Sequence, residues 1–260
     1  MMRVGVEVGG TFTDLVAIDG DEIRVTKVPS TPSAPHVGAL NALEAGEVSL
    51  ARVADLIHGS TVATNAILER KGARVVFLVT KGFRDLLILQ RHNRRSIYDL
   101  AYHKPLPVIA RTDVIEIDER IDSAGEVVVE LDDTALRESL REKLTGEDYA
   151  SVAICLLNSY TNPAHERRVA SMIGQLAPHL TVTCSCDVTR EFREYERAST
   201  TTLAAYVQPV IDRYLSSLES ELSGRGFEGR FSVMQSNGGR LRRVLIFPTL
   251  GDLGCSQLLS

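Results

Sequence analysis

Two continuous apolar stretches constrain the fold more than any other feature of this sequence. Residues 74–80 and 149–157 are each of strand length and show little alternation of polar and apolar side chains. Strands of this kind are buried on both faces, as in parallel sheets covered by helices. Helical patterns follow them, because leucines recur every four residues over 132–145 and Asn162-Pro163 begins a helix that extends to about Leu176. This order predicts an α/β protein with a mixed sheet and flanking helices.

The remaining segments fit the same class. Apolar alternation and turn residues predict strands at residues 22–28, 55–59, 180–185 and 231–234. Helical periodicity predicts helices at residues 37–45, 62–71 and 196–222, the last of them kinked at Pro209. Residues 112–121 and 126–131 flank Ser123-Ala124-Gly125, which predicts a hairpin. We find no internal repeat and no composition typical of an interdomain linker.

The first fourteen residues contain the strongest functional pattern. Three valines alternate with Gly5 and Glu7 as in a strand, and a Gly-Gly turn and two threonines follow them. Glycines allow backbone N–H groups to approach a ligand closely, hydroxyls can donate to it, and carboxylates suit Mg²⁺. The residues concerned are Glu7, Gly9, Gly10, Thr11, Thr13 and Asp14. They form the parts of a phosphate-binding hairpin, although an ordinary β-hairpin with a glycine-rich turn explains them too.

Three other polar segments have both a functional and a structural interpretation. Residues 58–65 lie at a strand-to-helix junction, which can bind an anion or can simply cap the helix, with His58 as a structural histidine. Residues 90–95 form a basic loop that can hold a carboxylate or phosphate, or can be a solvated surface loop. Residues 191–202 alternate acids and arginines, which can orient a substrate or can pair along one helix.

Composition and charge exclude some partners. The 260 residues are 44% hydrophobic and 24% charged, as in a globular protein, and the net charge of −5 gives no reason to expect nucleic acid or an anionic membrane. We find no apolar run of membrane-spanning length and no signal peptide before the first strand. The four cysteines follow no zinc-site spacing. These features predict a cytoplasmic protein without a membrane or nucleic-acid partner.

Seven separated motifs occur along the chain, and in chain order they lie at residues 9–14, 58–73, 82–83, 98–100, 162–167, 194–197 and 234–239. Together they resemble the N-terminal part of the hydantoinase A/oxoprolinase family. The resemblance covers about residues 3–239, and its specificity comes from the order of the motifs, since each one alone is weak.

The resemblance implies the N-terminal half of an actin-like, ribonuclease-H-like ATPase. It implies ATP and Mg²⁺ as cofactors, activation of a small cyclic amide such as a hydantoin or 5-oxoproline for ring opening, and a hydantoinase B-type partner subunit. Related members serve ketone carboxylases instead. A sugar or acetate kinase shares the phosphate hairpin, but does not account for residues 62–65 and 194–197.

The resemblance also implies roles for individual residues. Gly9, Gly10, Thr11 and Thr13 would contact phosphate, and Asp14 would support that loop or orient a water. Glu7 would lie near Mg²⁺ at a position where the family usually has Asp. His58 and Asn65, together with Thr61 and Thr64, would lie toward the substrate, and Arg91 would contact an anion. We therefore expect Asp14, His58 and Asn65 to be the catalytic candidates.

Residues 240–260 depart from the family pattern, as a shifted reading frame or a truncated gene would make them. The family continues into a second actin-like half with a second phosphate hairpin, and no second Gly-Gly-Thr motif follows residue 14 here. We therefore expect the chain to form half of an ATP cleft. It would be either the N-terminal portion of an enzyme subunit or a non-catalytic remnant or assembly module.

Overall fold

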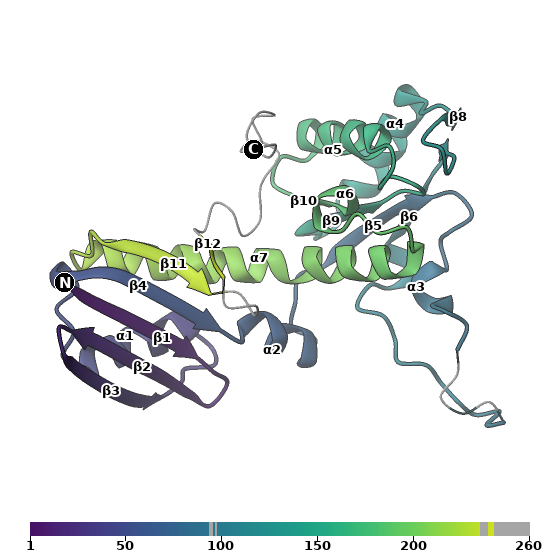
Figure 1. Ribbon diagram of the computed structural model, residues 1–260. Coiled ribbons are helices and arrows are strands. Elements are labelled where there is room, and N and C mark those ends of the chain that lie inside the picture. Colours follow the sequence, from purple (N-terminus) through teal and green to yellow (C-terminus); the bar gives the residue numbers. More distant parts are fainter. Residues whose placement is uncertain (94–95, 97, 235–238, 242–260) are drawn as a thin grey trace. The chain divides into compact units, whose positions relative to one another are not determined.

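The chain forms two compact units. The computed structural model describes residues 1–93, 96, 98–234 and 239–241. Unit 1 combines Met1–Lys71 with Val210–Ser260, and unit 2 is Gly72–Pro209. Figure 1 labels the elements of both units along the chain. Each unit has its own sheet and its own hydrophobic core.

Unit 1 is built on a six-stranded mixed sheet. Its strands are β1 (Met2–Val8), β2 (Phe12–Asp19), β3 (Glu22–Pro29), β4 (Val53–Ser60), β11 (Arg230–Met234) and β12 (Arg240–Leu241). They lie in the order β12-β11-β4-β1-β2-β3. The pairs β1–β2, β2–β3 and β11–β12 are antiparallel, whereas β4 pairs in parallel with both β1 and β11. The mixed sheet with flanking helices that the sequence predicts is confirmed.

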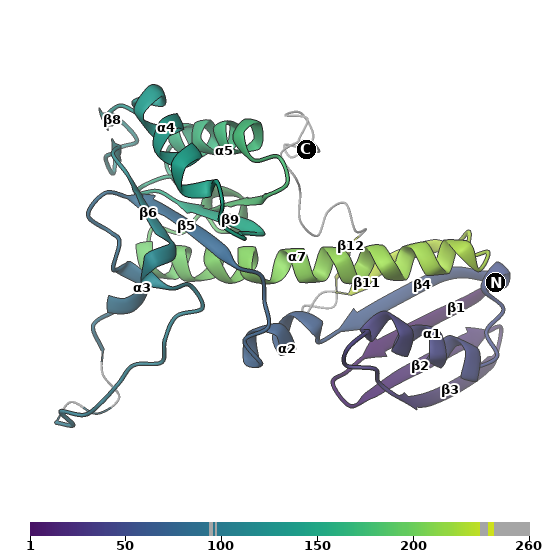
Figure 2. The same ribbon diagram turned by 180° about the vertical axis from the view of Figure 1, so that it is seen from behind.

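One face of this sheet is covered by helices. Every second residue of β1 is buried, as its valine pattern predicts. Helix α1 (Pro35–Ala45) lies across this face (Figure 2), and Leu218 and Leu222 of α7 (Glu194–Gly224) belong to the same core. Helix α2 (Val62–Leu68) follows β4 directly. The opposite face leaves Ile23 and Val25 well exposed.

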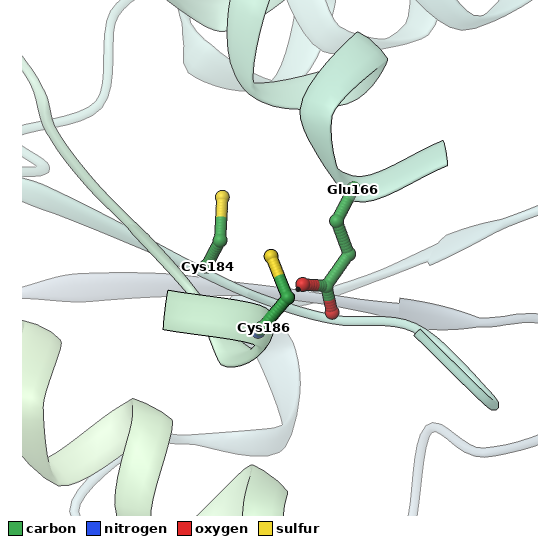
Figure 3. Close-up of side chains that lie close together, drawn as sticks. All are labelled: Glu166, Cys184 and Cys186. Carbon is green, nitrogen blue, oxygen red and sulfur yellow. Dashed lines mark hydrogen bonds between the residues drawn. The ribbon is translucent and has the colours of Figure 1, made fainter. Parts of the chain in front are cut away.

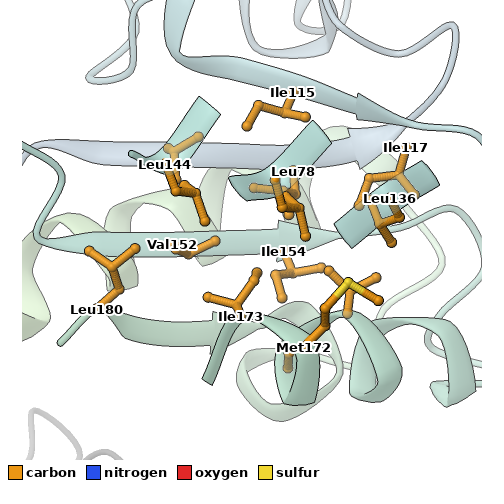
Figure 4. Close-up of a cluster of buried hydrophobic side chains, with 14 of the residues drawn as sticks. Leu78, Ile115, Ile117, Leu136, Leu144, Val152, Ile154, Met172, Ile173 and Leu180 are labelled. Atoms are coloured by element: carbon orange, nitrogen blue, oxygen red, sulfur yellow. The ribbon is translucent and has the colours of Figure 1, made fainter. Parts of the chain in front are cut away.

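Unit 2 is built on a four-stranded parallel sheet. Its strands are β5 (Val75–Thr80), β6 (Val114–Ile117), β9 (Ser151–Cys155) and β10 (Thr181–Cys184), in the order β10-β9-β5-β6. Every residue of β5 and β9 is buried, which confirms the interpretation of the two apolar stretches. Helices α4 (Asp133–Leu144) and α5 (Ala164–Leu176) contribute leucine, methionine and isoleucine side chains to the core over this sheet (Figure 4).

Some boundaries differ from the sequence-based expectation. Strand β6 joins the main sheet of unit 2, and only the short strands β7 (Arg120–Ile121) and β8 (Val127–Val129) form the expected hairpin. Helix α2 ends at Leu68, and Arg70 has a φ of 53°, which an α-helix does not allow. Short helices not expected from the sequence are α3 (Leu86–Leu89) and α6 (Ser185–Val188), with the 3₁₀ turns η1 (Leu50–Arg52) and η2 (Arg111–Asp113).

The boundary between the units passes through a helix. Pro209 is the last residue of unit 2 and lies inside α7 without ending it. A boundary of this kind has no loop composition, so the sequence shows no linker there. No described helix is long and apolar enough to span a membrane.

Candidate functional site

The turn between β1 and β2 is tight and leaves backbone donors free. The Gly9 N–H donates to the Phe12 carbonyl at 3.0 Å, and a Cβ on Gly9 would lie 3.0 Å from that same oxygen. The Ser30 N–H donates to the Thr11 carbonyl at 2.9 Å. The N–H groups of Gly10 and Thr11 donate to no residue that the structure describes. Free N–H groups on a glycine turn are the groups that bind phosphate oxygens.

The junction between β4 and α2 lies against this turn. The Thr61 N–H donates to the Val8 carbonyl at 3.1 Å, and the Asn65 side-chain amide donates to the Thr61 hydroxyl at 3.3 Å. A Cβ on Gly10 would lie 3.4 Å from Asn65 Nδ2. The structure thus brings Gly10, Thr61 and Asn65 together. The N-cap residue Thr61 makes no side-chain capping bond, but the hydroxyl of the preceding Ser60 accepts from the N–H of the first helical residue at 3.1 Å.

A cavity of about 630 Å³ opens beside the Gly9-Gly10 turn, within unit 1. This volume falls in the range of small-molecule sites, roughly 300–1,000 Å³. Four segments line it: the turn itself, residues 30–36 before and at the start of α1, one face of α2, and one face of α7. The side chains that line it and can donate or carry charge are Ser30, Thr31, Ser33, His36, Asn65, Glu69, Lys71, Arg213, Tyr214 and Ser217.

His58 is fully buried and contacts Tyr214. Its Nε2 lies 2.6 Å from the Tyr214 hydroxyl oxygen. Burial lowers the pKa of His58 to about 4, and burial likewise raises the pKa of Tyr214. At neutral pH the pair is therefore an uncharged imidazole hydrogen-bonded to a protonated phenol. Tyr214 lines the cavity but His58 does not, so a role for His58 in chemistry stays a prediction.

Glu7 and Asp14 are direct cross-strand partners on the sheet face opposite α1. Burial and the neighbouring Asp14 charge raise the pKa of Glu7. Its carboxylate lies over Gly59, where a Cβ would be 1.8 Å from Oε2, and Asp14 forms an ion pair with Lys27 at 2.9 Å. Two neighbouring carboxylates on one sheet face fit a hard divalent cation. Glu7, with Asp14 beside it, is the residue that would hold Mg²⁺.

Among the predicted site residues, only Gly9, Gly10 and Asn65 line the cavity, and the others, Thr11 and Thr61 included, do not. Thr13 is fully buried, and its hydroxyl is 2.9 Å from that of Ser30, so it ties the two segments next to the turn together. Thr64 is exposed on α2 and does not line the cavity. Arg91 belongs to unit 2, where it forms an ion pair with Glu196. Their predicted contacts with ligands stay predictions.

Unit 2 contains a buried acidic residue that the sequence analysis did not single out. Glu166 is completely buried, and its carboxylate accepts four hydrogen bonds, at 2.6–3.0 Å, from the Leu156 and Cys186 N–H groups and the Ser159 and Ser185 hydroxyls. The thiols of Cys184 and Cys186 lie next to this carboxylate (Figure 3). The four hydrogen bonds occupy the carboxylate oxygens of Glu166, which leaves them poorly available to a metal. Because the donors follow β9 and β10, Glu166 connects the ends of these two strands.

A second buried network lies at the end of β5. The Thr80 hydroxyl donates to Glu119, and the other oxygen of that carboxylate is 2.7 Å from His165 Nδ1. The Leu157 N–H donates to the Thr80 hydroxyl at 2.8 Å, which connects β5 to the segment after β9. His165 and Glu166 belong to the Asn162–Arg167 motif. In the sequence, the signal for this network is the position of its polar residues: Glu119 comes just after a strand, and His165 lies in the first turn of a helix.

The sequence matches two family models and several characterised relatives. Residues 3–176 match the model of the hydantoinase/oxoprolinase N-terminal region, and residues 197–243 match that of hydantoinase/oxoprolinase. The chain is 34% identical to the acetophenone carboxylase gamma subunit of Aromatoleum aromaticum, over 91% of this chain and 35% of the relative. It is 31% identical to 5-oxoprolinase of Saccharomyces cerevisiae, over 98% of this chain and 24% of the relative.

The fold matches a solved enzyme structure. The crystal structure of the ATP-dependent caprolactamase from Pseudomonas jessenii superposes with a TM-score of 0.80 at 30% identity, over 92% of this chain and 36% of that chain. This match supports the mixed α/β architecture. The chain spans only about a quarter to a third of the length of the relatives it matches.

Proposed function

We infer the function of this chain from the family to which it belongs. It is a member of the hydantoinase/oxoprolinase family, whose N-terminal model matches residues 3–176. We propose that it is the N-terminal portion of an ATP-dependent enzyme that opens a cyclic amide ring. The observation that supports this proposal most is the Gly9-Gly10 turn, because both glycines line a cavity of small-molecule size and the Gly10 N–H donates to no described residue. One solved relative with a matching fold is an ATP-dependent caprolactamase.

In this proposal the turn binds the terminal phosphates of the nucleotide. The N–H groups of Gly10 and Thr11 and the exposed Thr11 hydroxyl donate to phosphate oxygens. Thr13 holds the turn against Ser30, and Glu7 holds Mg²⁺ with Asp14 beside it. The longer Glu side chain at position 7 reaches back over Gly59 rather than straight into solvent, which sets where its oxygens lie.

ATP would supply an activated amide: the amide oxygen attacks the γ-phosphorus, the bond to the β–γ bridging oxygen breaks, and ADP leaves with that electron pair. The residues of this chain then contribute position and charge compensation, which are the main sources of catalysis in phosphoryl transfer. Asn65, which lies beside Gly10, would donate to the amide group of the substrate. Water would then add to the activated carbon, the C–N bond would break to give an amine and an acyl phosphate, and a second water would release inorganic phosphate and leave a carboxylate.

A second subunit belongs to this proposal. The relatives named as gamma subunit and subunit alpha are, by those names, parts of larger assemblies. We therefore propose a hydantoinase B-type partner for this chain as well. Ketone carboxylation is the second candidate function, and the 34% identity to an acetophenone carboxylase subunit favours it.

Nucleotide titration tests the phosphate-binding role. We expect weak, Mg²⁺-dependent ATP binding by the purified chain, followed by NMR, because one phosphate loop alone supplies only part of a nucleotide site. Gly10→Ala adds a methyl group where the phosphate would approach the turn, in ordinary contact with Asn65 at 3.4 Å, and should weaken this binding about tenfold. Gly174→Ala is the matched control, because a Cβ there meets nothing within 4 Å.

Two results would contradict the proposal. One is ATP binding that Gly10→Ala and Gly174→Ala leave equally unchanged. The other concerns the assembly with a hydantoinase B-type partner, which should open hydantoin or 5-oxoproline rings only when ATP is present. Carboxylation of a ketone by that assembly, without ring opening, would select the second candidate function instead.

A further inference from the structure

We propose that residues 98–104 of unit 2 form a docking turn, which inserts Tyr98 and Leu100 into an apolar pocket with an acidic rim on the partner subunit. These residues lie in the segment between α3 and β6 (Figure 1) and include the Tyr98-Asp99-Leu100 motif, which the proposed reaction does not use. The inference takes the partner subunit from the proposed function. It goes beyond that function, because the docking turn belongs to unit 2 and the proposed phosphate site belongs to unit 1.

Tyr98 and Leu100 are almost completely exposed. Their exposed fractions are 95% and 98%, and apart from Met1 no large apolar side chain in the described part of the chain is more exposed. Single, partly exposed apolar residues are common on protein surfaces. Here, however, folding buries almost none of either side chain. Their apolar area is therefore left for contact with another molecule.

The docking turn is organised before any partner binds. The Asp99 carboxylate accepts from the Ala101 N–H at 2.9 Å, and the Asp99 carbonyl accepts from the Tyr102 N–H at 3.2 Å. The Lys104 ammonium donates to the Leu89 carbonyl at 2.8 Å, which ties the end of the turn to α3. A turn that its own side chain and backbone already hold loses less conformational entropy when it binds.

The segment that leads toward the docking turn begins in a defined conformation. Gln90 and His92 have φ values of 55° and 57°, which few residues other than glycine adopt. Such conformations cost energy and persist only where the surrounding structure holds them. Between them, Arg91 forms an ion pair with Glu196 in the first turn of α7. The segment therefore starts from a fixed point on unit 2.

The sequence around the docking turn is basic, which indicates the chemistry of its partner. Residues 90–104 contain one acid and four cations, in a chain whose net charge is −5. The acid is Asp99, and the cations are Arg91, Arg94, Arg95 and Lys104. Acidic groups around the receiving pocket would speed association and exclude wrong partners. Because relatives are named as a gamma subunit and a subunit alpha, we assign this pocket to a separate subunit rather than to a second copy of this chain.

Binding of a purified hydantoinase B-type subunit tests this inference without nucleotide or substrate. Titration calorimetry measures the dissociation constant for the wild-type chain and for each variant. We expect Tyr98→Ala and Leu100→Ala each to weaken binding at least about tenfold, with an unchanged Tm because both side chains are exposed. Val128→Ala is the matched control and should bind as the wild type does, because this side chain is 62% exposed but lies on β8.

Two variants of Asp99 separate the shape of the docking turn from its charge. Asp99→Ala loses the acceptor for the Ala101 N–H and should weaken binding. Asp99→Asn keeps a side-chain oxygen and removes the one negative charge of this segment, so its affinity should equal or exceed that of the wild type. Equal weakening in both variants would contradict an acidic rim on the partner.

The outcomes are separable from those of the nucleotide experiment. Wild-type affinity in both Tyr98→Ala and Leu100→Ala overturns the docking turn while leaving the partner subunit and ATP binding untouched. The absence of any complex overturns both the docking turn and the partner subunit. Self-association of this chain that Leu100→Ala abolishes would also overturn the inference, because the occupant would then be a second copy. A complex weakened by both variants supports the inference even if the chain binds no ATP.

Discussion

His58 and Tyr214 show how burial determines the chemistry of a single residue. The imidazole has no exposed surface, and its one side-chain hydrogen bond among the described residues goes to the Tyr214 hydroxyl. Burial lowers the pKa of His58 to about 4, against an ordinary value of 6.5. The folded chain therefore resists protonation of this ring, whereas the unfolded chain accepts it.

Stability should fall as the pH decreases from 6.5 to about 4. In this window the unfolded state binds a proton at His58 that the folded state does not, so acidification favours unfolding by up to about 3 kcal/mol. Urea unfolding at several pH values measures this slope. His58→Gln cannot titrate and should flatten it relative to the wild type, even if the variant is less stable throughout. An unchanged slope would contradict a depressed His58 pKa.

Gly59 should be required for the position of Glu7. A Cβ at residue 59 would lie 1.8 Å from Glu7 Oε2, so Gly59→Ala must displace this carboxylate. Because the displaced group is the end of a flexible side chain, we expect a change in Tm of only a few degrees. The Mg²⁺ dependence of ATP binding should fall as much as in Glu7→Gln. Wild-type Mg²⁺ dependence in Gly59→Ala would place the cation elsewhere.

At the residue level, two segments that the sequence singles out separately lie together because each follows a strand of the same sheet. Gly10 and the junction at Thr61 and Asn65 meet because β1 and β4 are adjacent parallel strands, whose carboxyl ends lie together. Arg91 is different, because a basic loop gives no information about which unit it joins. Its ion pair with Glu196 became visible only when two distant segments were placed in space.

At the level of elements, α4 has the clearest start signal. The Asp132 carboxylate accepts from the N–H groups of Thr134 and Ala135 at 3.0 Å, and Leu136, Leu140 and Leu144 form the buried face. The local sequence alone specifies both features, because capping and periodicity involve residues within a few positions of each other.

Removing this cap should destabilise unit 2. Asp132→Ala loses both hydrogen bonds and should lower the free energy of unfolding by about 1 kcal/mol. Asp132→Asn keeps a side-chain oxygen at the same place and should lose much less. Chemical denaturation of the two variants side by side measures the difference. Equal losses would show that charge, rather than the capping oxygen, stabilises this helix.

The expected hairpin at residues 112–131 shows the limit of local patterns. Its first segment is apolar enough for a strand, but that strand pairs with β5 rather than with its neighbour in the chain. A period-two pattern states that a segment is extended and partly buried, and does not name its partner. Only β7 and β8, which flank Gly125 with a φ of 89°, pair locally as the turn predicts.

At the level of the whole molecule, unit 2 depends on a buried polar centre. Glu166 accepts the Leu156 N–H, and the fully buried guanidinium of Arg197 donates to the Leu156 carbonyl. Opposite charges thus bind the N–H and the carbonyl of one residue, Leu156, directly after β9. Removing one member of such a network leaves the other groups buried without partners.

Glu166→Gln should destabilise unit 2 selectively. We expect a loss of about 2–4 kcal/mol in unit 2, because the neutral amide cannot compensate Arg197 and brings two donors among groups that already donate. Hydrogen exchange followed by mass spectrometry reads the two units separately. Faster exchange in β5, β9 and β10 with unchanged exchange in β1 and β2 is the expected result. Equal acceleration in both sheets would show that the units unfold together.

The sequence by itself determined the family, the mixed α/β class and the glycine turn of unit 1. Periodicity and turn chemistry depend on residues close together in the chain, and the order of the motifs can be read along the sequence without knowing the fold. The tertiary structure decided the division into two units, the buried polar networks of unit 2 and the cavity that Arg213 shares with the Gly9-Gly10 turn. Those features join residues far apart in the chain, and only packing of helices on the two sheets fixes which distant side chains meet.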